Sequence, residues 1–346
     1  MDPARALLLP ASWVYGCVAA VRHRAFDAGL LRQESAGVPV VAVGNLTAGG
    51  TGKTPFVEYL VGALLRRGRV PGVVSRGYGR ETRGVRIVAC GGALRCDARE
   101  GGDEPVQIAR KFPGAAVVVG ERRVEAAHTA VRECGADVIV MDDGFQHRYL
   151  RRDLDVLVMD ARSDIRREHL LPAGMRREWL AGINRADLLV FSRSAGSAPP
   201  AWANGLTAVR EGRAVMVRYG IGGFVAFGDR VSAVPANPAF AFSGIGDPAL
   251  FAEGLRQRGV IVAGTHAFPD HHRYTAADLA SVVAGAAASG ARTIVTTEKD
   301  ASRLAAGPIP AGLAGMQVAV LAVEILGGRD MLDKMLDAML TRTPAP

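Results

Sequence analysis

The segment at residues 44–55, GNLTAGGTGKTP, combines closely spaced glycines with one lysine and, directly after it, a threonine. It follows a β-branched run and precedes a helical pattern, the context in which backbone N–H groups and a helix N-terminus bind phosphate. Lys53 would contact phosphate oxygens and Thr54 would contact Mg²⁺. The match is imperfect because the first glycine of the usual G-x4-GK[ST] pattern falls at Thr47, and a glycine-rich helix cap is the alternative. The other residues expected to bind phosphate are Gly49, Gly50, Thr51 and Gly52.

Two adjacent acids, Asp142 and Asp143, follow the strand-like run ADVIVM at residues 136–141. A P-loop enzyme needs a carboxylate at the end of a neighbouring strand to orient its metal ion. We expect one of these acids to reach Mg²⁺ through water and the other to hold a loop or a second metal. The alternative is that both acids only cap the turn before Gly144.

Three further polar clusters lie in loops. SRGYGR (75–80) follows a strand-like run, at the sheet edge where α/β proteins bind ligands. GGDEP (101–105) places Asp103 and Glu104 after two glycines, where Asp103 could also be an ordinary helix cap. FPDHH (268–272) contains two histidines; adjacent residues rarely chelate one metal, so acid–base chemistry or phosphate contact is the functional reading. Solvated loop histidines are the alternative.

The composition limits the possible classes of function. The 346 residues are 49% hydrophobic and 22% charged, which indicates a globular chain of about two domains rather than a disordered or coiled-coil protein. No uncharged apolar run reaches the ~20 residues of a membrane span, so a polytopic membrane protein is excluded. The net charge of +8 favours acidic partners, but the basic residues are scattered, and nucleic acid is not expected. Only four of the 42 basic residues are lysines, so each lysine suggests a specific use: Lys53, Lys111, Lys299 and Lys334.

The four cysteines, Cys17, Cys90, Cys96 and Cys134, form no CxxC pair and no cluster at metal-ligand spacing. This pattern predicts reduced structural thiols in a cytosolic environment. A zinc site is not expected.

The amino-terminal residues 6–21 carry no formal charge and are followed by Arg-His-Arg at 22–24. The run is short for a membrane span, and Pro10 should disturb its first turn. A secretory signal is disfavoured because little positive charge precedes the run. Two alternatives remain open: a helix in a membrane surface with Trp13 and Tyr15 at headgroup depth, or a helix docked on the protein's own core.

From Val38 onward, short β-branched runs alternate with helical patterns, which predicts a parallel sheet covered by helices. The pattern breaks over residues 194–235, where a short β-ribbon is expected near 224–231, and a second β/α series follows. We therefore predict two α/β lobes with a flexible junction. Strands are expected at 39–43, 70–74, 115–119, 138–141, 156–159, 188–191, 239–242, 260–262, 293–296 and 318–323, with the main helices ending near 67, 134, 258 and 289.

Ten segments, in order over most of the chain, resemble the tetraacyldisaccharide 4′-kinase (lipid A 4′-kinase, LpxK) family. Each motif is weak by itself, but ten in register are highly specific. The chain departs from the family where Met175 and Trp179 stand in place of the usual prolines. The segments are VGNLTAGGTGKTP (43–55), SRGYGR (75–80), GDEP (102–105), the Arg-x-x-Ala of 123–126, MDDGFQH (141–147), RDLD (152–155), LPAGMRRE (171–178), FSGIGDP (242–248), FPDHH (268–272) and TTEKDA (296–301).

The resemblance implies an α/β fold with two P-loop-like three-layer lobes, mostly parallel sheets, a short connecting β-ribbon and an N-terminal interfacial helix. The implied domains are a membrane-associated helix (1–35), a P-loop kinase core lobe (36–222) and a smaller C-terminal lobe that includes the ribbon (223–346). The implied enzyme is a lipid kinase that uses ATP and Mg²⁺ to phosphorylate the 4′-hydroxyl of a tetraacyldisaccharide 1-phosphate, giving lipid IVA in lipid A biosynthesis. It would act at the cytoplasmic face of the bacterial inner membrane, peripheral or monotopic, as a monomer.

The resemblance also implies roles for individual residues. Asp103 and His271 match the family's acid–histidine pair that activates the sugar hydroxyl, and because they lie in different lobes, closure should assemble them. Lys53 and Arg123 complete the catalytic set, and Thr54, Asp142 and Asp143 the metal set. Nucleotide contacts fall on Gly49, Gly50, Thr51, Gly52, Lys53, Thr54 and Gln146, and substrate contacts on Arg76, Tyr78, Glu104, Arg177 and Glu178.

A membrane-associated P-loop NTPase switch without a phosphoryl acceptor is the alternative function. A switch has less need of an acid–histidine pair drawn from distant segments, which favours the kinase.

Overall fold

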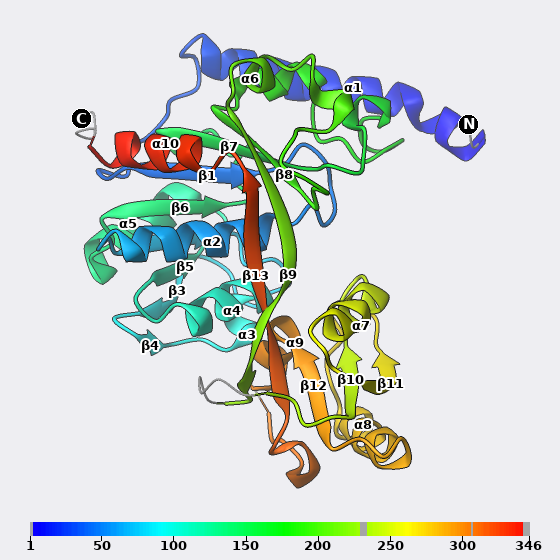
Figure 1. The fold of residues 1–346 in the computed structure, drawn as a ribbon. Coiled ribbons are helices and arrows are strands. Elements are labelled where there is room, and N and C mark those ends of the chain that lie inside the picture. Colours follow the sequence, from blue (N-terminus) through cyan, green and yellow to red (C-terminus); the bar gives the residue numbers. More distant parts are fainter. Residues whose placement is uncertain (1–2, 229–233, 306, 342–346) are drawn as a thin grey trace.

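One mixed sheet runs through both halves of the molecule (Figure 1). The computed structural model describes residues 3–228, 234–305 and 307–341, and in these ranges the strand order is β11-β10-β12-β13-β9-β8-β7-β1-β6-β2-β5-β3-β4. Most neighbouring strands are parallel, so the predicted α/β class is confirmed. The strands are β1 (Val40–Gly44), β2 (Pro71–Ser75), β3 (Arg86–Cys90), β4 (Ala93–Leu94), β5 (Ala116–Val119), β6 (Val138–Asp142), β7 (Leu154–Asp160), β8 (Leu188–Ser192), β9 (Ala214–Ala226), β10 (Ala239–Ser243), β11 (Val262–Ala267), β12 (Thr293–Thr297) and β13 (Gln317–Gly327).

Helices cover both faces of the sheet in the larger, N-terminal lobe. The strands β1, β2, β5 and β6 are buried along their whole length, as expected for valine-rich parallel strands packed on two sides. Apolar side chains of α2, α4 and α10 pack on one face, and those of α5 pack on the other. The helices are α1 (Pro3–Asp27), α2 (Lys53–Arg66), α3 (Ala98–Gly101), α4 (Asp103–Lys111), α5 (Arg123–Cys134), α6 (Thr207–Arg210), α7 (Pro248–Gln257), α8 (Ala276–Ala288), α9 (Glu298–Leu304) and α10 (Arg329–Thr341), with 3-10 turns at Ile165–Arg167, Leu180–Arg185, Ala201–Ala203 and Ala311–Leu313.

The two lobes are joined by a long antiparallel ribbon of β9 and β13 (Figure 1). We expected only a short ribbon near residues 224–231 and took 318–323 for a strand of the second series. That expectation was wrong in extent, because β9 also pairs with β8 and β13 also pairs with β12, so that the ribbon makes one continuous sheet. The predicted lobe boundary at residues 222/223 falls inside β9, and residues 229–233 of the predicted ribbon lie outside the described residues.

The C-terminal lobe has α7 and α8 on opposite faces of its strands. The strand predicted at residues 260–262 begins only at Val262. Gly259, with a φ of 78°, ends the preceding turn, and Val260 then packs in the core instead of pairing with a strand. β11 is the edge strand, with exposed and half-buried residues alternating.

Two local expectations need correction. The helix α1 continues through Pro10, which we expected to disturb it. Cys90 on β3 and Cys134 at the end of α5 form a disulfide with Cα atoms 5.4 Å apart, so the prediction of four reduced thiols was wrong for this pair. Among the described residues, no helix has the length and apolar character needed to cross a membrane.

Candidate active site

The glycine-rich loop connects β1 to α2 at the carboxyl edge of the sheet. Gly49 and Gly52 have φ values of 107° and 80°, in the region that favours glycine. A Cβ atom on Gly52 would also overlap the ring of Tyr219. Thr47 does not need glycine, because it forms a β-bridge with Arg176, and this explains how the loop tolerates the departure from the usual pattern.

Three side chains that sequence reasoning missed hold this loop in place. The Asn45 amide donates to Thr51 Oγ1 at 3.0 Å, and the Ser192 hydroxyl donates to the Thr51 carbonyl at 2.7 Å. The Tyr219 hydroxyl donates to the Gly52 carbonyl at 2.7 Å. Asn45 lies inside the recognised motif, but Ser192 and Tyr219 come from β8 and β9, and nothing near them in sequence points to the loop.

Lys53, the first residue of α2, lies beside one of the paired acids. Its ammonium is 3.4 Å from Asp143 Oδ1, and the same carboxylate accepts a hydrogen bond from Arg177 at 2.8 Å. Burial alone would raise the pKa of Asp143, but the charges of Lys53 and Arg177 lower it below its usual value. Asp143 has a φ of 52°, uncommon for a residue other than glycine. The structure thus brings together three predicted site residues.

Asp142, the last residue of β6, has the features of a cation ligand. It is 3% exposed, and its Oδ1 has no hydrogen-bond partner among the described residues. Burial and then the charge of Glu104 raise the pKa of Asp142 to about 7, against the lowering effect of Lys53. The described residues contain no group of three or more acidic, histidine or cysteine side chains that could hold a metal. That Asp142 and Thr54 hold Mg²⁺, together with phosphate and water oxygens, stays a prediction.

Asp103 and His271 are in contact across the two lobes. His271 Nδ1 lies 3.1 Å from Asp103 Oδ2, although the residues are 168 positions apart. His271 has a φ of 60°, an uncommon backbone conformation that is often found at functional sites. The ring of Tyr78 meets His271 edge-on at 6.2 Å between centroids. The pair is thus assembled in this structure, and its assembly by lobe closure stays a prediction.

One predicted arginine, Arg123, lies near the paired acids. Arg123 is 5% exposed and donates to the Gly120 carbonyl at 2.9 Å. Burial lowers the pKa of Arg123, against the charges of Asp143 and Asp142, while the charge of Arg76 lowers it further. Arg123 therefore contributes positive potential beside the paired acids, and Arg76 is close enough to Arg123 for the two charges to interact.

Glu178, a predicted substrate contact, lies inside the protein at 2% exposure. Its carboxylate accepts from Gln146 at 2.8 Å, pairs with Arg185 at 2.7 Å and lies 3.2 Å from His23 Nε2. Gln146 also donates to the Asn45 carbonyl at 2.9 Å. Glu178 therefore links α1 to the base of the phosphate loop, and its contact with substrate stays a prediction.

Replacing His23 with Gln is expected to reduce the loss of stability in acid. Burial lowers the pKa of His23 from 6.5 to about 4. The charge of Glu178 raises this pKa, but the charges of the nearby arginines lower it further, so Glu178 does not compensate for burial. The unfolded chain binds this proton below about pH 6.5 and the folded chain only near pH 4, so stability falls as pH drops through this window. From pH 7 to pH 5 the unfolding free energy of H23Q should fall by about 2 kcal/mol less than that of the wild type. Urea unfolding at both pH values measures this, and equal losses would contradict it.

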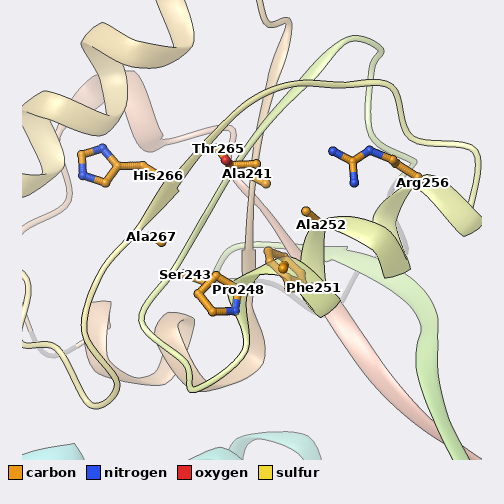
Figure 2. A pocket seen from close by; sticks show the side chains of 10 residues that line it. Ala241, Ser243, Pro248, Phe251, Ala252, Arg256, Thr265, His266 and Ala267 are labelled. Atoms are coloured by element: carbon orange, nitrogen blue, oxygen red, sulfur yellow. The ribbon is translucent and has the colours of Figure 1, made fainter.

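A cavity of about 330 Å³ lies in the C-terminal lobe, between α7 and the strands β10 and β11 (Figure 2). Arg256 and His266 lie at opposite ends of the view, with Pro248 and Phe251 along the helix side. None of the predicted site residues lines this cavity, so it is not part of the candidate site.

A phosphate loop between a parallel strand and a helix, with an acid at the end of the neighbouring strand, defines a P-loop phosphate-binding protein. A family model described as "Tetraacyldisaccharide-1-P 4'-kinase" matches residues 4–341. The chain belongs to this family, as the ten motifs indicated. It is therefore a kinase, an enzyme that transfers a phosphoryl group to a hydroxyl.

Similar proteins span nearly the whole chain. The tetraacyldisaccharide 4′-kinase of Anaeromyxobacter sp. (strain K) is 41% identical over 99% of this chain and 93% of its own length. That of Chlorobium luteolum is 39% identical, over 96% of this chain and 97% of its own. The crystal structure of an "apo" form of LpxK from Aquifex aeolicus in complex with ATP has a TM-score of 0.78 at 30% identity, and covers 97% of this chain and 99% of that one.

Proposed function

We propose that this chain transfers the γ-phosphoryl group of ATP to the 4′-hydroxyl of a tetraacyldisaccharide 1-phosphate, giving lipid IVA, with Mg²⁺ as cofactor. The observation that carries the proposal is the contact of Asp103 with His271 across the two lobes. Glu104, the next residue, is close enough to Asp142 for its charge to raise the pKa of that acid. This charge effect supports a single site that combines a base for the acceptor hydroxyl with a loop for the donor phosphates.

Asp103 would accept the hydroxyl proton as the oxygen attacks the γ-phosphorus and the bond to the leaving ADP oxygen breaks. A carboxylate is a weak base for an alcohol, but in phosphoryl transfer positioning and charge neutralisation dominate catalysis. Lys53 and Arg123 would stabilise the charge on the transferred group. Bound Mg²⁺, held through Asp142 and Thr54, would neutralise phosphate oxygens.

The contact of Lys53 with Asp143 supports a donor phosphate site. The Lys53 side chain is 14% exposed, and its ammonium lies 3.4 Å from Asp143, a carboxylate that also pairs with Arg177. A triphosphate in the loop would compete for the ammonium, and Arg177 would then keep Asp143 paired. The exposed side chains of Arg76 and Tyr78 are the groups we propose for the acidic sugar headgroup.

A labelling assay tests this function. Purified protein is mixed with γ-labelled ATP, Mg²⁺ and the detergent-dispersed disaccharide lipid, and label is measured in lipid and in free phosphate. Label in the lipid is expected. Free phosphate alone would support the NTPase switch instead, and release of neither product would leave no support for either activity.

We further propose that α1 contacts the cytoplasmic face of the inner membrane and that the enzyme acts as a monomer, because one chain supplies the whole site. One side of α1 is docked: Ser12 accepts from the Ala173 amide at 3.0 Å, and Trp13 packs edge-on against Trp179. The opposite side is apolar but exposed, and α1 lies at the end of the molecule away from the C-terminal lobe (Figure 1). This stripe consists of Leu7, Val14, Val18 and Val21, exposed by 83%, 65%, 64% and 65%.

The double variant V14D/V18D is expected to bind anionic lipid vesicles at least ~10-fold more weakly than the wild type, because it removes two apolar contacts and adds negative charge. Its affinity for ATP should be unchanged, since neither side chain faces the docked side of the helix. Vesicle co-sedimentation and nucleotide titration measure the two. Ile261→Asp, at a 63% exposed position in the C-terminal lobe, is the matched control. Equal vesicle binding by all three proteins would refute the surface.

A further inference from the structure

The helix α9 supplies an arginine to the catalytic pair. Arg303 Nε donates to Asp103 Oδ2 at 2.7 Å, and this is the same oxygen that His271 Nδ1 contacts at 3.1 Å. Within the described part of the chain, the bonds of the Asp103 carboxylate are made by Oδ2. The second oxygen, Oδ1, is thereby left for the acceptor hydroxyl.

Arg303 is held firmly, because its side chain is only 5% exposed and has further partners. Its NH1 group donates to Asp300 at 2.9 Å and to the Gly244 carbonyl at 2.8 Å. Asp300 is fully buried and also accepts from the Tyr274 hydroxyl at 2.9 Å and from the Gly244 amide. Such a network restricts the guanidinium to one position.

Lys299, on the same helix, contacts the other side of His271. Its ammonium lies 3.2 Å from His271 Nε2 and 3.3 Å from Asp270 Oδ1. An ammonium can only donate, so the Lys299 contact favours a lone pair on Nε2 and a neutral ring. A hydrogen on Nδ1 satisfies the contacts of the ring with Lys299 and with Asp103, whereas a hydrogen on Nε2 would satisfy only the 3.3 Å contact of Arg303 Nη2 with Nδ1. The Nδ1–H tautomer is therefore assigned from the hydrogen-bond network.

We propose that Lys299 and Arg303 are positioning residues for phosphoryl transfer. Arg303 holds Asp103 Oδ2, and Lys299 keeps His271 in the neutral Nδ1–H tautomer that orients the same carboxylate. This inference rests on the proposed function and assigns a role to the TTEKDA segment, which sequence analysis left without one. A simple ion pair of Lys299 with Asp270 is the competing explanation, and it requires no effect on the histidine.

The first test compares steady-state kinetics of Lys299→Met, Lys299→Arg and a control, Lys334→Met, at an exposed lysine on α10. K299M is expected to lower kcat about 10- to 100-fold through misplacement of the base, with KM for ATP within about twofold of the wild type. K299R retains a donor cation and should recover most of the loss, and K334M should match the wild type. Wild-type kcat in K299M would overturn the proposal.

The second test uses long-range ¹H–¹⁵N NMR of the whole protein labelled at histidine, with His271→Gln to assign the signal. The wild type is expected to show His271 neutral with the proton on Nδ1, and K299M should show the Nε2–H form or a mixture. A protonated or Nε2–H ring in the wild type, or an unchanged tautomer in K299M, would overturn the proposal. This readout does not need the lipid substrate, so failure of the proposed function and failure of this inference are distinguishable.

Discussion

Asp103→Asn should lower kcat for transfer to the lipid by about 10²- to 10⁴-fold, the range for loss of a general base. Asparagine has nearly the same shape but cannot accept the hydroxyl proton. ATP affinity should remain within about threefold, because the phosphate loop is built on β1 and α2 and Asp103 begins α4. Initial rates of lipid labelling at saturating ATP, together with nucleotide titration, measure both quantities.

Asp333→Asn provides the matched control for this experiment. Asp333 pairs with Arg67 at 2.7 Å, much as Asp103 pairs with Arg303, but it lies on α10. This variant should transfer phosphate at nearly the wild-type rate. A nearly unchanged kcat in D103N would show that the base is another group, and an equal loss in both variants would point to a general effect of breaking an acid–arginine pair.

Lys53→Met should lower kcat by about 10²- to 10³-fold or more, the range for removing one preorganised charge from a transition state. Unlike Asp103→Asn, this substitution should also weaken the binding of ATP. The Lys53 ammonium is the only side-chain cation of the loop, and it would contact the phosphates in both the ground state and the transition state. The two variants therefore separate donor binding from acceptor activation. Nucleotide titration and lipid labelling, run side by side, measure this difference.

Lys334→Met again serves as the control, since it removes an exposed lysine without touching the site. Thermal unfolding of K53M should be close to that of the wild type, because Arg177 still pairs with Asp143 at 2.8 Å. An ATP affinity equal to the wild type would argue against Lys53 as a phosphate ligand. A large loss of stability would attribute the lost activity to folding instead.

The contact between Asp103 and His271 is explained by the way α4 packs on α9. At one end Asp103 pairs with Arg303, and at the other Lys111 lies 2.9 Å from Glu298 and 2.6 Å from Glu58. Burial raises the pKa of Glu58 to about 7, against the charge of Lys111. The two helices, one from each lobe, are thus connected at both ends, which holds the base against its histidine.

Local features of this protein could be predicted from the sequence. The phosphate loop, the paired acids and most strands were placed within one or two residues. These features depend mainly on residues that are adjacent in the sequence. Examples are the turn that needs glycine at positive φ, the helix that begins at Lys53 and the strand of buried valines. The spacing of glycines and apolar residues therefore predicts them directly.

The partners of those features were decided only by tertiary structure. No pattern near Gly52 indicates that Tyr219, 167 residues away, would brace the loop, and none near Asp103 indicates Arg303. Likewise, nothing near Glu178 in the sequence indicates that this buried carboxylate would lie 3.2 Å from His23 of α1. The physical reason is that local backbone conformation depends on a few neighbouring residues, whereas these contacts depend on how helices from two lobes pack against one continuous sheet.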